Sequence, residues 1–259
     1  SVDEANFSNS SAYMGGEKFI FEAGDRPRDL SGSIDWIAVR NKYFAAIISP
    51  ENPADVEGAY FDGFKEGIQN NGVREYYTAG LVVPFKNTNL ESKSFSLYLG
   101  PISYSLLKGY NKNYEAIVDF GGFFGLKVII RPISEYVLLP LFNFLNKYIP
   151  NYGVVIIIFA LIIKIAVYPL TKASFKSMKK MQLLQPKMTE IREKFKDDPQ
   201  KMNKEVMKLY STYGINPMGG CFPLLLQLPI FIALWGLFQA AIELRQQPFI
   251  SYITDLSRP

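Results

Sequence analysis

An apolar run at residues 152–168 limits what this chain can fold into, because only one residue in it, Lys164, carries a charge. At about 1.5 Å per residue the run is roughly 25 Å long, which is close to the hydrocarbon thickness of a bilayer. The run therefore predicts a helix that spans a membrane. A lysine at the centre of such a helix costs roughly 2.5 to 3.5 kcal/mol on insertion scales, and less where its ammonium reaches water. Two interpretations are open: Lys164 extends to the membrane interface, or it lines a polar cavity.

The distribution of charge divides the chain into an acidic and a basic part. Residues 1–126 carry 16 acidic and 11 basic side chains, whereas residues 171–216 carry 11 basic and 5 acidic ones. The acidic part has no long apolar run and the basic part lies between two of them, so we predict one domain outside the membrane and one within it. The N-terminus has neither the basic start nor the apolar core of a signal peptide, and we expect the chain to be a fragment.

The composition excludes several kinds of catalytic site. The 259 residues include no histidine, which removes imidazole general-base chemistry and histidine metal ligands. No paired-carboxylate spacing or Gly-rich phosphate loop stands out, so we predict no catalytic residue, no metal site and no cofactor. The single cysteine, Cys221, has glycine and phenylalanine neighbours and is predicted to be a small packing residue rather than a reactive thiol.

Residues 1–122 are predicted to form an antiparallel β-sandwich. Short alternating or apolar segments such as KFIFEAG, REYYTAGLVVPF and SFSLYLGP are separated by Gly, Pro, Asn and Asp. This pattern is typical of strands joined by turns. The acidic residues of this part are scattered, which indicates solvated side chains rather than an acid/base pair.

Residues 123–150 combine an apolar body with a polar stripe. Polar side chains recur at multiples of four residues, namely Lys127, Arg131, Glu135, Asn143 and Lys147. Such a stripe favours a helix that lies in the membrane interface, and a core helix of the preceding domain is the alternative. Pro132 and Pro140 are expected to kink this helix or split it into shorter pieces.

Residues 171–215, which follow the first predicted span at 151–170, are predicted to form an antiparallel helical hairpin. Apolar residues recur at spacings of three and four in both arms: Met181, Leu184, Met188, Ile191 and Phe195, then Met202, Val206, Leu209 and Tyr213. Between the arms, Asp198 is suited to cap the second helix and Pro199 to occupy its first position. Gly214 is suited to close it.

The outer faces of the predicted hairpin are strongly basic. They carry Lys176, Lys179, Lys180, Lys187 and Arg192. No aromatic platform or recognition motif accompanies this charge, so we predict no specific nucleic-acid partner. An excess of Lys and Arg marks cytoplasmic loops, which places the hairpin in the cytoplasm. Two interpretations are open: the charge only sets the topology, or it also docks anionic lipid or the ribosome.

The second predicted span occupies residues 216–243 and contains Gln227. This glutamine has two open interpretations, a hydrogen bond to a neighbouring helix and a place in the lining of a wet groove. The topology follows, with residues 1–150 outside, the hairpin inside and residues 244–259 outside again. Two helices cannot enclose a polar cavity around Lys164, so we expect further helices to take part.

Linked motifs occur in order along residues 123–259: FFGLKVIIRPISEYVLLPLF, VYPLTKASFKSMKKMQLLQPK, NPMGGCFPLLLQLPIF, and ELRQQPF followed by DLS. In these motifs the chain resembles the YidC family of membrane protein insertases. WIAVRNKYFAAIISP and YLGPISYSLL are similar to the large periplasmic domain of Gram-negative members. The resemblance implies a periplasmic β-supersandwich, an inner-membrane location and five core membrane helices. Against that pattern, residues 1–259 are expected to be a part of the family's chain without the N-terminal anchor and without everything after the second core helix.

The resemblance also implies roles for individual residues. Family members carry a cation, usually arginine, in a hydrophilic groove that is closed to the outside and open to cytoplasm and lipid, and Lys164 falls at that position. A lysine can lose its proton when desolvated, so this groove is expected to depend more on local water. Gln227 and Tyr168 are assigned to the groove lining, and Leu228 and Phe231 match positions that contact substrate. The hairpin is implied to receive the substrate early.

Together these expectations predict a membrane protein insertase and chaperone rather than an enzyme. It moves segments of nascent membrane proteins into the bacterial inner membrane, alone or with the Sec translocon. Its predicted partners are nascent membrane proteins, the Sec translocon and membrane lipids, with the ribosome as a further candidate. The alternative is a membrane-anchored envelope protein whose periplasmic sandwich binds carbohydrate or a partner, since supersandwich folds occur in carbohydrate-active proteins.

Overall fold

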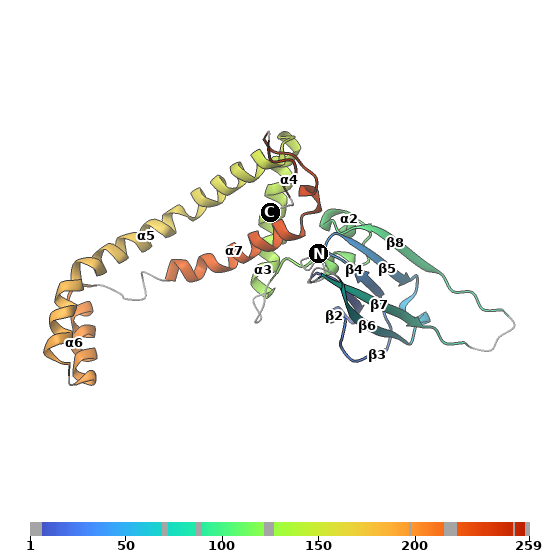
Figure 1. The fold of residues 1–259 in the computed structure, drawn as a ribbon, viewed down its shortest axis with the longest axis horizontal. Helices are drawn as coiled ribbons and strands as arrows, with labels where there is room; N and C mark the ends of the chain where they lie inside the picture. Colours follow the sequence, from blue (N-terminus) through green and yellow to red (C-terminus); the bar gives the residue numbers. More distant parts are fainter. Residues whose placement is uncertain are drawn as a thin grey trace. The chain divides into compact units, whose positions relative to one another are not determined.

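The computed structural model divides the chain into two compact units (Figure 1). The first unit comprises Ser1–Asp119 with Ala240–Glu243, and the second comprises Phe120–Gln239 with Leu244–Pro259. The residues that the structure describes are 7–68, 72–85, 90–121, 127–196, 198–214, 222–250 and 252–256.

The first unit contains two β-sheets. The five-stranded sheet has the strand order β2-β1-β4-β5-β8, and the three-stranded sheet has the order β3-β6-β7. The strands of the larger sheet are β1 (Asn9–Met14), β2 (Glu17–Phe21), β4 (Trp36–Arg40), β5 (Phe44–Pro50) and β8 (Phe95–Pro101). Those of the smaller sheet are β3 (Arg28–Ser31), β6 (Gly58–Ile68) and β7 (Gly72–Val82). All neighbouring strands pair antiparallel.

Side chains from both sheets meet in one apolar core. Ala12 and Ile37 of the larger sheet are buried against Ala59 and Phe61 of the smaller one. The ring of Phe61 stacks on that of Phe21, with the ring centroids 4.3 Å apart. Alternate side chains of a strand point to opposite faces, so a short alternating segment can supply one side of such a core. The predicted antiparallel β-sandwich is confirmed.

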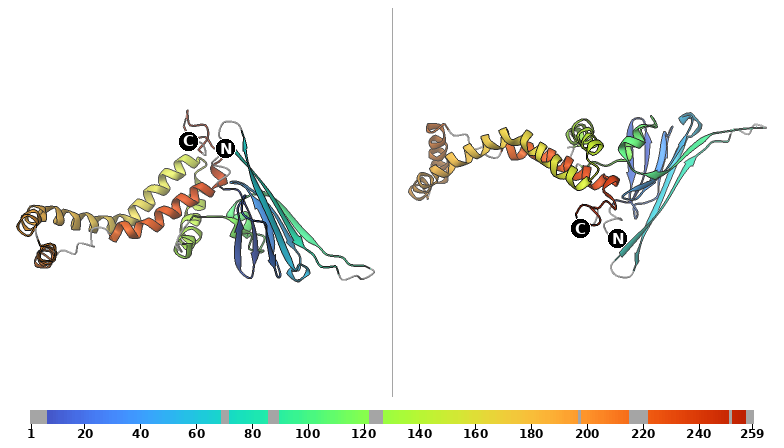
Figure 2. Two further views of the ribbon diagram at one scale, coloured as in Figure 1. Left: turned by 60° about the horizontal axis from the view of Figure 1, so that its bottom comes forward. Right: turned by 90° about the horizontal axis from the view of Figure 1, so that it is seen from above.

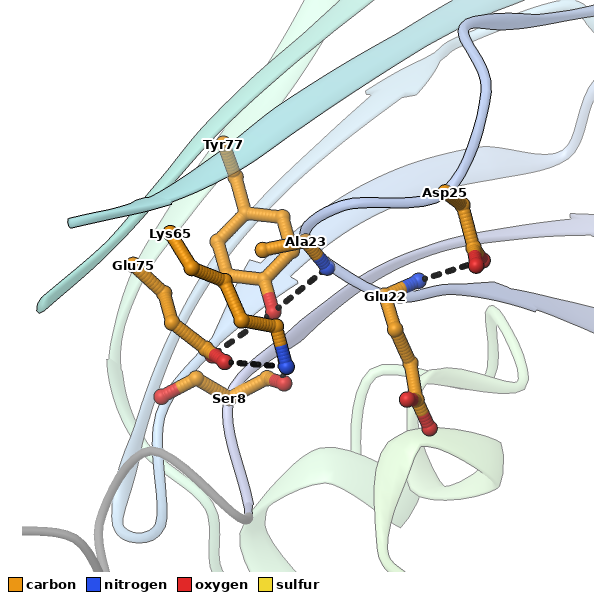
Figure 3. Close-up of polar contacts among 7 residues, drawn as sticks. All are labelled: Ser8, Glu22, Ala23, Asp25, Lys65, Glu75 and Tyr77. Carbon is orange, nitrogen blue, oxygen red and sulfur yellow. Dashed lines mark hydrogen bonds and ion pairs between the residues drawn. The ribbon is translucent and has the colours of Figure 1, made fainter. Parts of the chain in front are cut away.

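A polar network links the two sheets at one edge of the sandwich (Figure 3). The hydroxyl oxygen of Tyr77, in β7, lies 2.8 Å from the carbonyl oxygen of Ser8 and 2.9 Å from the carboxylate of Glu75. The same oxygen accepts a hydrogen bond from the backbone N–H of Ala23 at 3.3 Å. Glu75 forms an ion pair of 2.9 Å with Lys65 in β6. Burial, and then the hydrogen bond to Glu75, raise the pKa of Tyr77 well above its usual value.

A buried arginine holds the last part of the first unit against the larger sheet. This part contains the short helix α2 (Tyr104–Lys108) and the 3-10 turn Tyr114–Ile117. Arg40, at the end of β4, is 7% exposed, and its Nη1 donates to the carbonyl oxygen of Ile117 at 2.7 Å. Burial lowers the pKa of Arg40, and the nearby Asp119 opposes that change.

The second unit begins with a helical segment that changes its winding. Helix α3 (Lys127–Ile133) passes into a π-helical turn (Ser134–Leu138) and then into α4 (Leu139–Tyr148). The expected kink or split at the prolines therefore takes the form of a π turn between two α-helical pieces, which changes the hydrogen-bond ladder without breaking the helix. By length and composition, Val128–Tyr148 is also apolar enough to cross a membrane, so these two properties alone do not distinguish an interfacial helix from a span.

Helix α5 (Tyr152–Lys194) is one unbroken helix of 43 residues, drawn in yellow in Figures 1 and 2. At 1.5 Å per residue it is roughly 65 Å long, about twice the thickness of the hydrocarbon core. The apolar run ends near Pro169 as expected, but the helix continues through Pro169 and into the first arm of the hairpin. A proline removes one backbone donor, and the hydroxyl of Thr171, which donates to the carbonyl of Val167 at 3.1 Å, adds a bond at this point.

Helix α6 (Pro199–Thr212) packs on the end of α5, and the predicted hairpin is confirmed. Its small core contains Leu184 and Tyr210, flanked by the partly buried Met181, Met188, Val206 and Leu209. The caps agree with the prediction, since Asp198 Oδ1 accepts from the backbone N–H of Lys201 at 3.0 Å and Gly214 has a φ of +59°.

The predicted stripe does not include the most buried tyrosine of α6. Tyr213 of the stripe contacts Lys187 of α5 but is 46% exposed, whereas Tyr210, outside the stripe, is buried in the core of the hairpin. Spacings of three and four both continue a helical stripe, and the sequence pattern does not choose between them at the last turn. The hydroxyl of Tyr210 donates to the sulfur of Met188 at 3.3 Å.

Helix α7 (Phe222–Ala240) meets α4 and α5 through three phenylalanines. The ring of Phe159 in α5 lies 5.8 Å from that of Phe142 in α4 and 6.0 Å from that of Phe238 in α7. The third pair, Phe142 and Phe238, is 6.1 Å apart, and all three pairs are edge-on. We call these three residues the aromatic junction. Cys221 and the start of the predicted second span lie outside the described residues.

Candidate functional site

Lys164 lies on an exposed and otherwise apolar face of α5. It follows Phe159 by five residues, which places it about 8 Å along the helix axis from the aromatic junction. Leu161, Ile165 and Tyr168 lie within a turn of it and are 53%, 70% and 60% exposed. Among the described residues, Lys164 forms no hydrogen bond or ion pair. The apolar part of α5 therefore presents one cation, which has no counter-ion among the described residues.

Helix α7 presents a matching row of exposed apolar side chains. Leu228, Phe231 and Trp235 are separated by three and four residues and so share one helix face. They are 48%, 66% and 53% exposed. Along the helix axis, Phe231 lies about 10 Å and Leu228 about 15 Å from Phe238 in the junction. Measured from the junction, Trp235 is nearer than Lys164, Phe231 is slightly farther and Leu228 is farther still.

In the described part of α5 and α7, the ring contact between the two helices lies at the aromatic junction, where Phe159 meets Phe238. Within the described part of the chain, no hydrogen bond or ring contact joins Lys164 or Tyr168 to Gln227, Leu228 or Phe231. All five side chains are exposed, as residues that line a groove or touch a substrate must be. Their predicted roles therefore remain predictions.

Exposed apolar side chains on this scale indicate that lipid or other protein covers these helices. In the described part of the chain, two helices are long and apolar enough to cross a membrane, Val128–Tyr148 and Tyr152–Pro169, and less than a quarter of each is buried. The core helix of a soluble protein would bury most of its apolar surface. The apolar faces of α5 and α7 therefore suit the interior of a membrane.

The basic residues predicted on the hairpin are all exposed. They are Lys176, Lys179, Lys180, Lys187 and Arg192. The ammonium of Lys187 lies 4.7 Å from the ring centroid of Tyr213 and is hydrogen-bonded to its hydroxyl. The basic faces can therefore meet an anionic partner without rearrangement of the hairpin.

The first unit has a cavity of about 600 Å³ between its sheets, lined in part by Arg40, Phe44, Glu75 and Tyr77. Its charged side chains already bind within the protein, because Arg40 donates to Ile117 and Glu75 pairs with Lys65. Across the described residues there is no cluster of three or more side chains that could hold a metal ion. No observation at this cavity favours the alternative of a sugar-binding envelope protein.

The sequence patterns missed the residues that hold the helices together. Phe142, Phe159 and Phe238 lie in apolar runs in which every residue suits a membrane, so nothing marks them as a junction. Asn151 carries a weak signal, because asparagine before an apolar run is typical of a helix N-cap. In the structure its Oδ1 accepts from the backbone N–H of Val154 at 3.2 Å.

Comparison with known proteins assigns both parts of the chain. The family model described as "YidC periplasmic domain" matches residues 9–136, and the model "60Kd inner membrane protein" matches residues 144–259. The protein named Membrane protein insertase YidC of Chlorobaculum parvum is 42% identical over 265 residues, which cover 100% of this chain and 43% of that protein. The proteins of the same name from Chlorobaculum tepidum and Chloroherpeton thalassium are each 41% identical, over 100% and 99% of this chain. The chain thus spans about 43% of the length of the curated relatives that it matches. With a periplasmic β-domain, apolar helices suited to the inner membrane and this similarity along its whole length, the chain belongs to the YidC family of membrane protein insertases.

Proposed function

We propose that this chain forms part of an insertase that moves segments of nascent membrane proteins into the inner membrane, and that Lys164 is the cation of its groove. The observation that carries the proposal is the exposed Lys164 on an apolar helix, without a partner in the described residues. The names of the relatives support the activity. The process needs no covalent step, because it transfers a chain from water to lipid.

The ammonium of Lys164 lowers the cost of bringing an acidic segment into the membrane. Two unit charges 4 Å apart attract each other by about 4 kcal/mol at an effective dielectric constant of 20, and by about 1 kcal/mol in bulk water. Water in a groove beside Lys164 keeps the ammonium charged and also reduces the desolvation of the arriving carboxylate. The cation therefore acts where a polar tail must pass part-way across the bilayer.

The apolar part of the substrate follows a different surface. Leu228 and Phe231 offer an exposed apolar face along which a hydrophobic segment can move toward lipid. Gln227, on α7, and Tyr168, on α5, supply polar atoms for hydrogen bonds to a passing backbone. Because lipid tails are as apolar as these side chains, the segment can leave for the bilayer at little cost.

The hairpin is proposed to meet the substrate first and to lie in the cytoplasm. Its exposed cations, among them Lys179 and Lys180, attract anionic lipid headgroups or ribosomal RNA, and these contacts weaken with salt. Its methionine-containing core suits a surface that repacks. The Sec translocon is the proposed partner for substrates that need more than this groove. Residues 123–150 are proposed to lie in the periplasmic interface of the inner membrane.

Reconstitution of the complete protein into liposomes tests the role of Lys164. Protease protection of a small substrate with an acidic tail is scored for the wild type, Lys164→Ala and Lys164→Arg. The wild type and Lys164→Arg should insert the substrate, and Lys164→Ala should not. Equal insertion by all three proteins would mean that Lys164 only extends to the interface.

A further inference from the structure

The smaller sheet of the periplasmic unit has one face that points away from the core of the sandwich. Ala59 and Phe61 of β6 point into the core, so the alternate residues Tyr60, Asp62 and Phe64 point outward. The side chains of Tyr60 and Phe64 are 37% and 59% exposed. Exposed apolar side chains that gather on one face, among polar ones, mark an interaction site.

The strands on both sides of β6 complete this face. Residues that lie directly opposite each other in a sheet share a face, and the register of β3, β6 and β7 is fixed by their pairing. Asp29 and Gly80 lie opposite Tyr60, on β3 and β7. We call the following residues the outer face: Asp29, Tyr60, Asp62, Phe64, Tyr76, Thr78 and Gly80.

The outer face carries two aromatic platforms. The ring of Phe64 stacks on that of Tyr76, with the centroids 4.6 Å apart and an interplanar angle of 15°. Tyr60 precedes Phe64 by four residues in the same strand, which places the two platforms about 13 Å apart. A Cβ atom at Gly80 would meet no atom within 4 Å, so the space beside Tyr60 is open.

Two carboxylates lie beside the platform at Tyr60. Partial desolvation, and then the charge of Asp62 and its hydrogen bond to the hydroxyl, raise the pKa of Tyr60, and the charge of Asp29 adds to this. Within the described part of the chain, neither Asp29 nor Asp62 forms an ion pair. By contrast, Glu66 near the second platform lies opposite Arg74, which compensates its charge. The uncompensated negative charge is therefore at Tyr60.

This arrangement favours a guanidinium group over other ligands. A cation within about 6 Å of a tyrosine ring is attracted to its face, and a guanidinium can stack there while it binds a carboxylate through two N–H groups. A lysine ammonium is a compact and strongly hydrated charge, which suits stacking less well. A neutral sugar could stack on the rings but would leave both carboxylates without a counter-charge.

We propose that the outer face docks an extended segment of another protein, which carries an arginine and, four residues along the chain, an apolar side chain. The arginine stacks on Tyr60 and pairs with Asp62, and the apolar side chain covers Phe64 and Tyr76. In an extended segment, residues four apart lie on the same side and are about 13 Å apart, which matches the platforms. This partner site lies in the periplasmic unit and does not depend on the groove at Lys164.

Peptide binding to the complete protein in lipid nanodiscs tests the proposal. The probe is a fluorescein-labelled, serine-rich peptide with blocked ends, in which an arginine and a leucine are four residues apart, and binding is measured by fluorescence anisotropy. A peptide in which they are three residues apart presents the leucine on the opposite side, so it should bind more weakly. A peptide with lysine in place of the arginine should also bind more weakly.

Variants of the outer face separate its two contributions. Tyr60→Leu and Asp62→Asn should each weaken binding of the first peptide roughly two- to fivefold, the effect of one exposed cation–π contact or ion pair. Tyr60→Phe keeps the ring and should bind nearly as well as the wild type. Glu17→Gln and Phe95→Leu are matched controls, because both residues are exposed on the larger sheet and should not affect binding.

Several results would overturn the proposal. They are a lack of binding to the wild type, equal binding of the peptides with the two spacings, and no effect of either Tyr60→Leu or Asp62→Asn. Displacement of the peptide by the neutral sugar chitohexaose would assign the rings to a glycan instead. Self-association of the complete protein that is lost in Tyr60→Leu would assign the face to a second copy.

Discussion

Replacing Phe159 by alanine should loosen the aromatic junction where α4, α5 and α7 meet. The Phe159 side chain is 0% exposed, and its ring is edge-on to Phe142 and Phe238 at 5.8 and 6.0 Å. Edge-on pairs contribute about 0.5–1.5 kcal/mol each beyond area burial, so the loss of two pairs amounts to roughly 1–3 kcal/mol. Transfer from water adds little here, because lipid is the medium around the helices. Phe159→Ala should therefore lower the free energy of unfolding by roughly 1–3 kcal/mol.

The assay is unfolding of the complete protein by increasing SDS in lipid bicelles, scored by loss of the protease-resistant membrane fragment. Ile157→Ala is the matched control, because Ile157 lies in the same helix and is 50% exposed. Phe159→Leu keeps most of the volume but loses both ring pairs, so it should fall between the control and Phe159→Ala. The reasoning would be refuted if Phe159→Ala and Ile157→Ala had the same midpoint.

Three further predictions concern the hairpin and the periplasmic unit. Asp198→Ala removes the cap of α6 and should destabilise the hairpin by about 0.5–2 kcal/mol, whereas Asp198→Ser should not, as measured by hydrogen exchange of the α6 amides. Arg40→Met leaves the carbonyl of Ile117 without its buried donor and should cost about 1–3 kcal/mol, measured by pulse proteolysis of the periplasmic unit. The pKa of Tyr77 is raised in the folded state, so its contribution to stability is fully present below its unfolded value of 10.0 and is lost as the pH rises toward the folded value. Stability should therefore fall above about pH 10 in the wild type and less in Tyr77→Phe, and equal pH profiles would contradict this.

Local patterns predicted most of the secondary structure. Alternation of apolar and polar residues identified the strands, because each strand of the sandwich buries one face. The caps at Asp198 and Gly214 were predictable because capping depends on a few neighbouring residues. Lys164 could be identified as the candidate site because it is the only charge in the apolar run at residues 152–168, which is also a local pattern.

Features set by contacts between distant residues could not be predicted in this way. Whether α5 ends at Pro169 depends on the helical turns before and after that proline. In the structure the helix continues through Pro169. Which tyrosine of α6 is buried depends on how α6 packs on α5, and Tyr210 is the one that joins Leu184 in the core. The hydrogen bond from Asn151 to the backbone carbonyl of Phe249 joins residues 98 positions apart, which no local pattern contains.

The central claim is that the charge of Lys164 acts on the charge of the substrate, and insertion kinetics of four combinations test it most directly. Wild-type and Lys164→Gln proteins, complete and in liposomes, are each given a substrate with an acidic tail and the same substrate with its carboxylates replaced by amides. The account predicts that Lys164→Gln slows the acidic substrate about tenfold or more and leaves the neutral one nearly unchanged, so that the two changes are not additive. An equal loss for both substrates, or no loss for either, would contradict it.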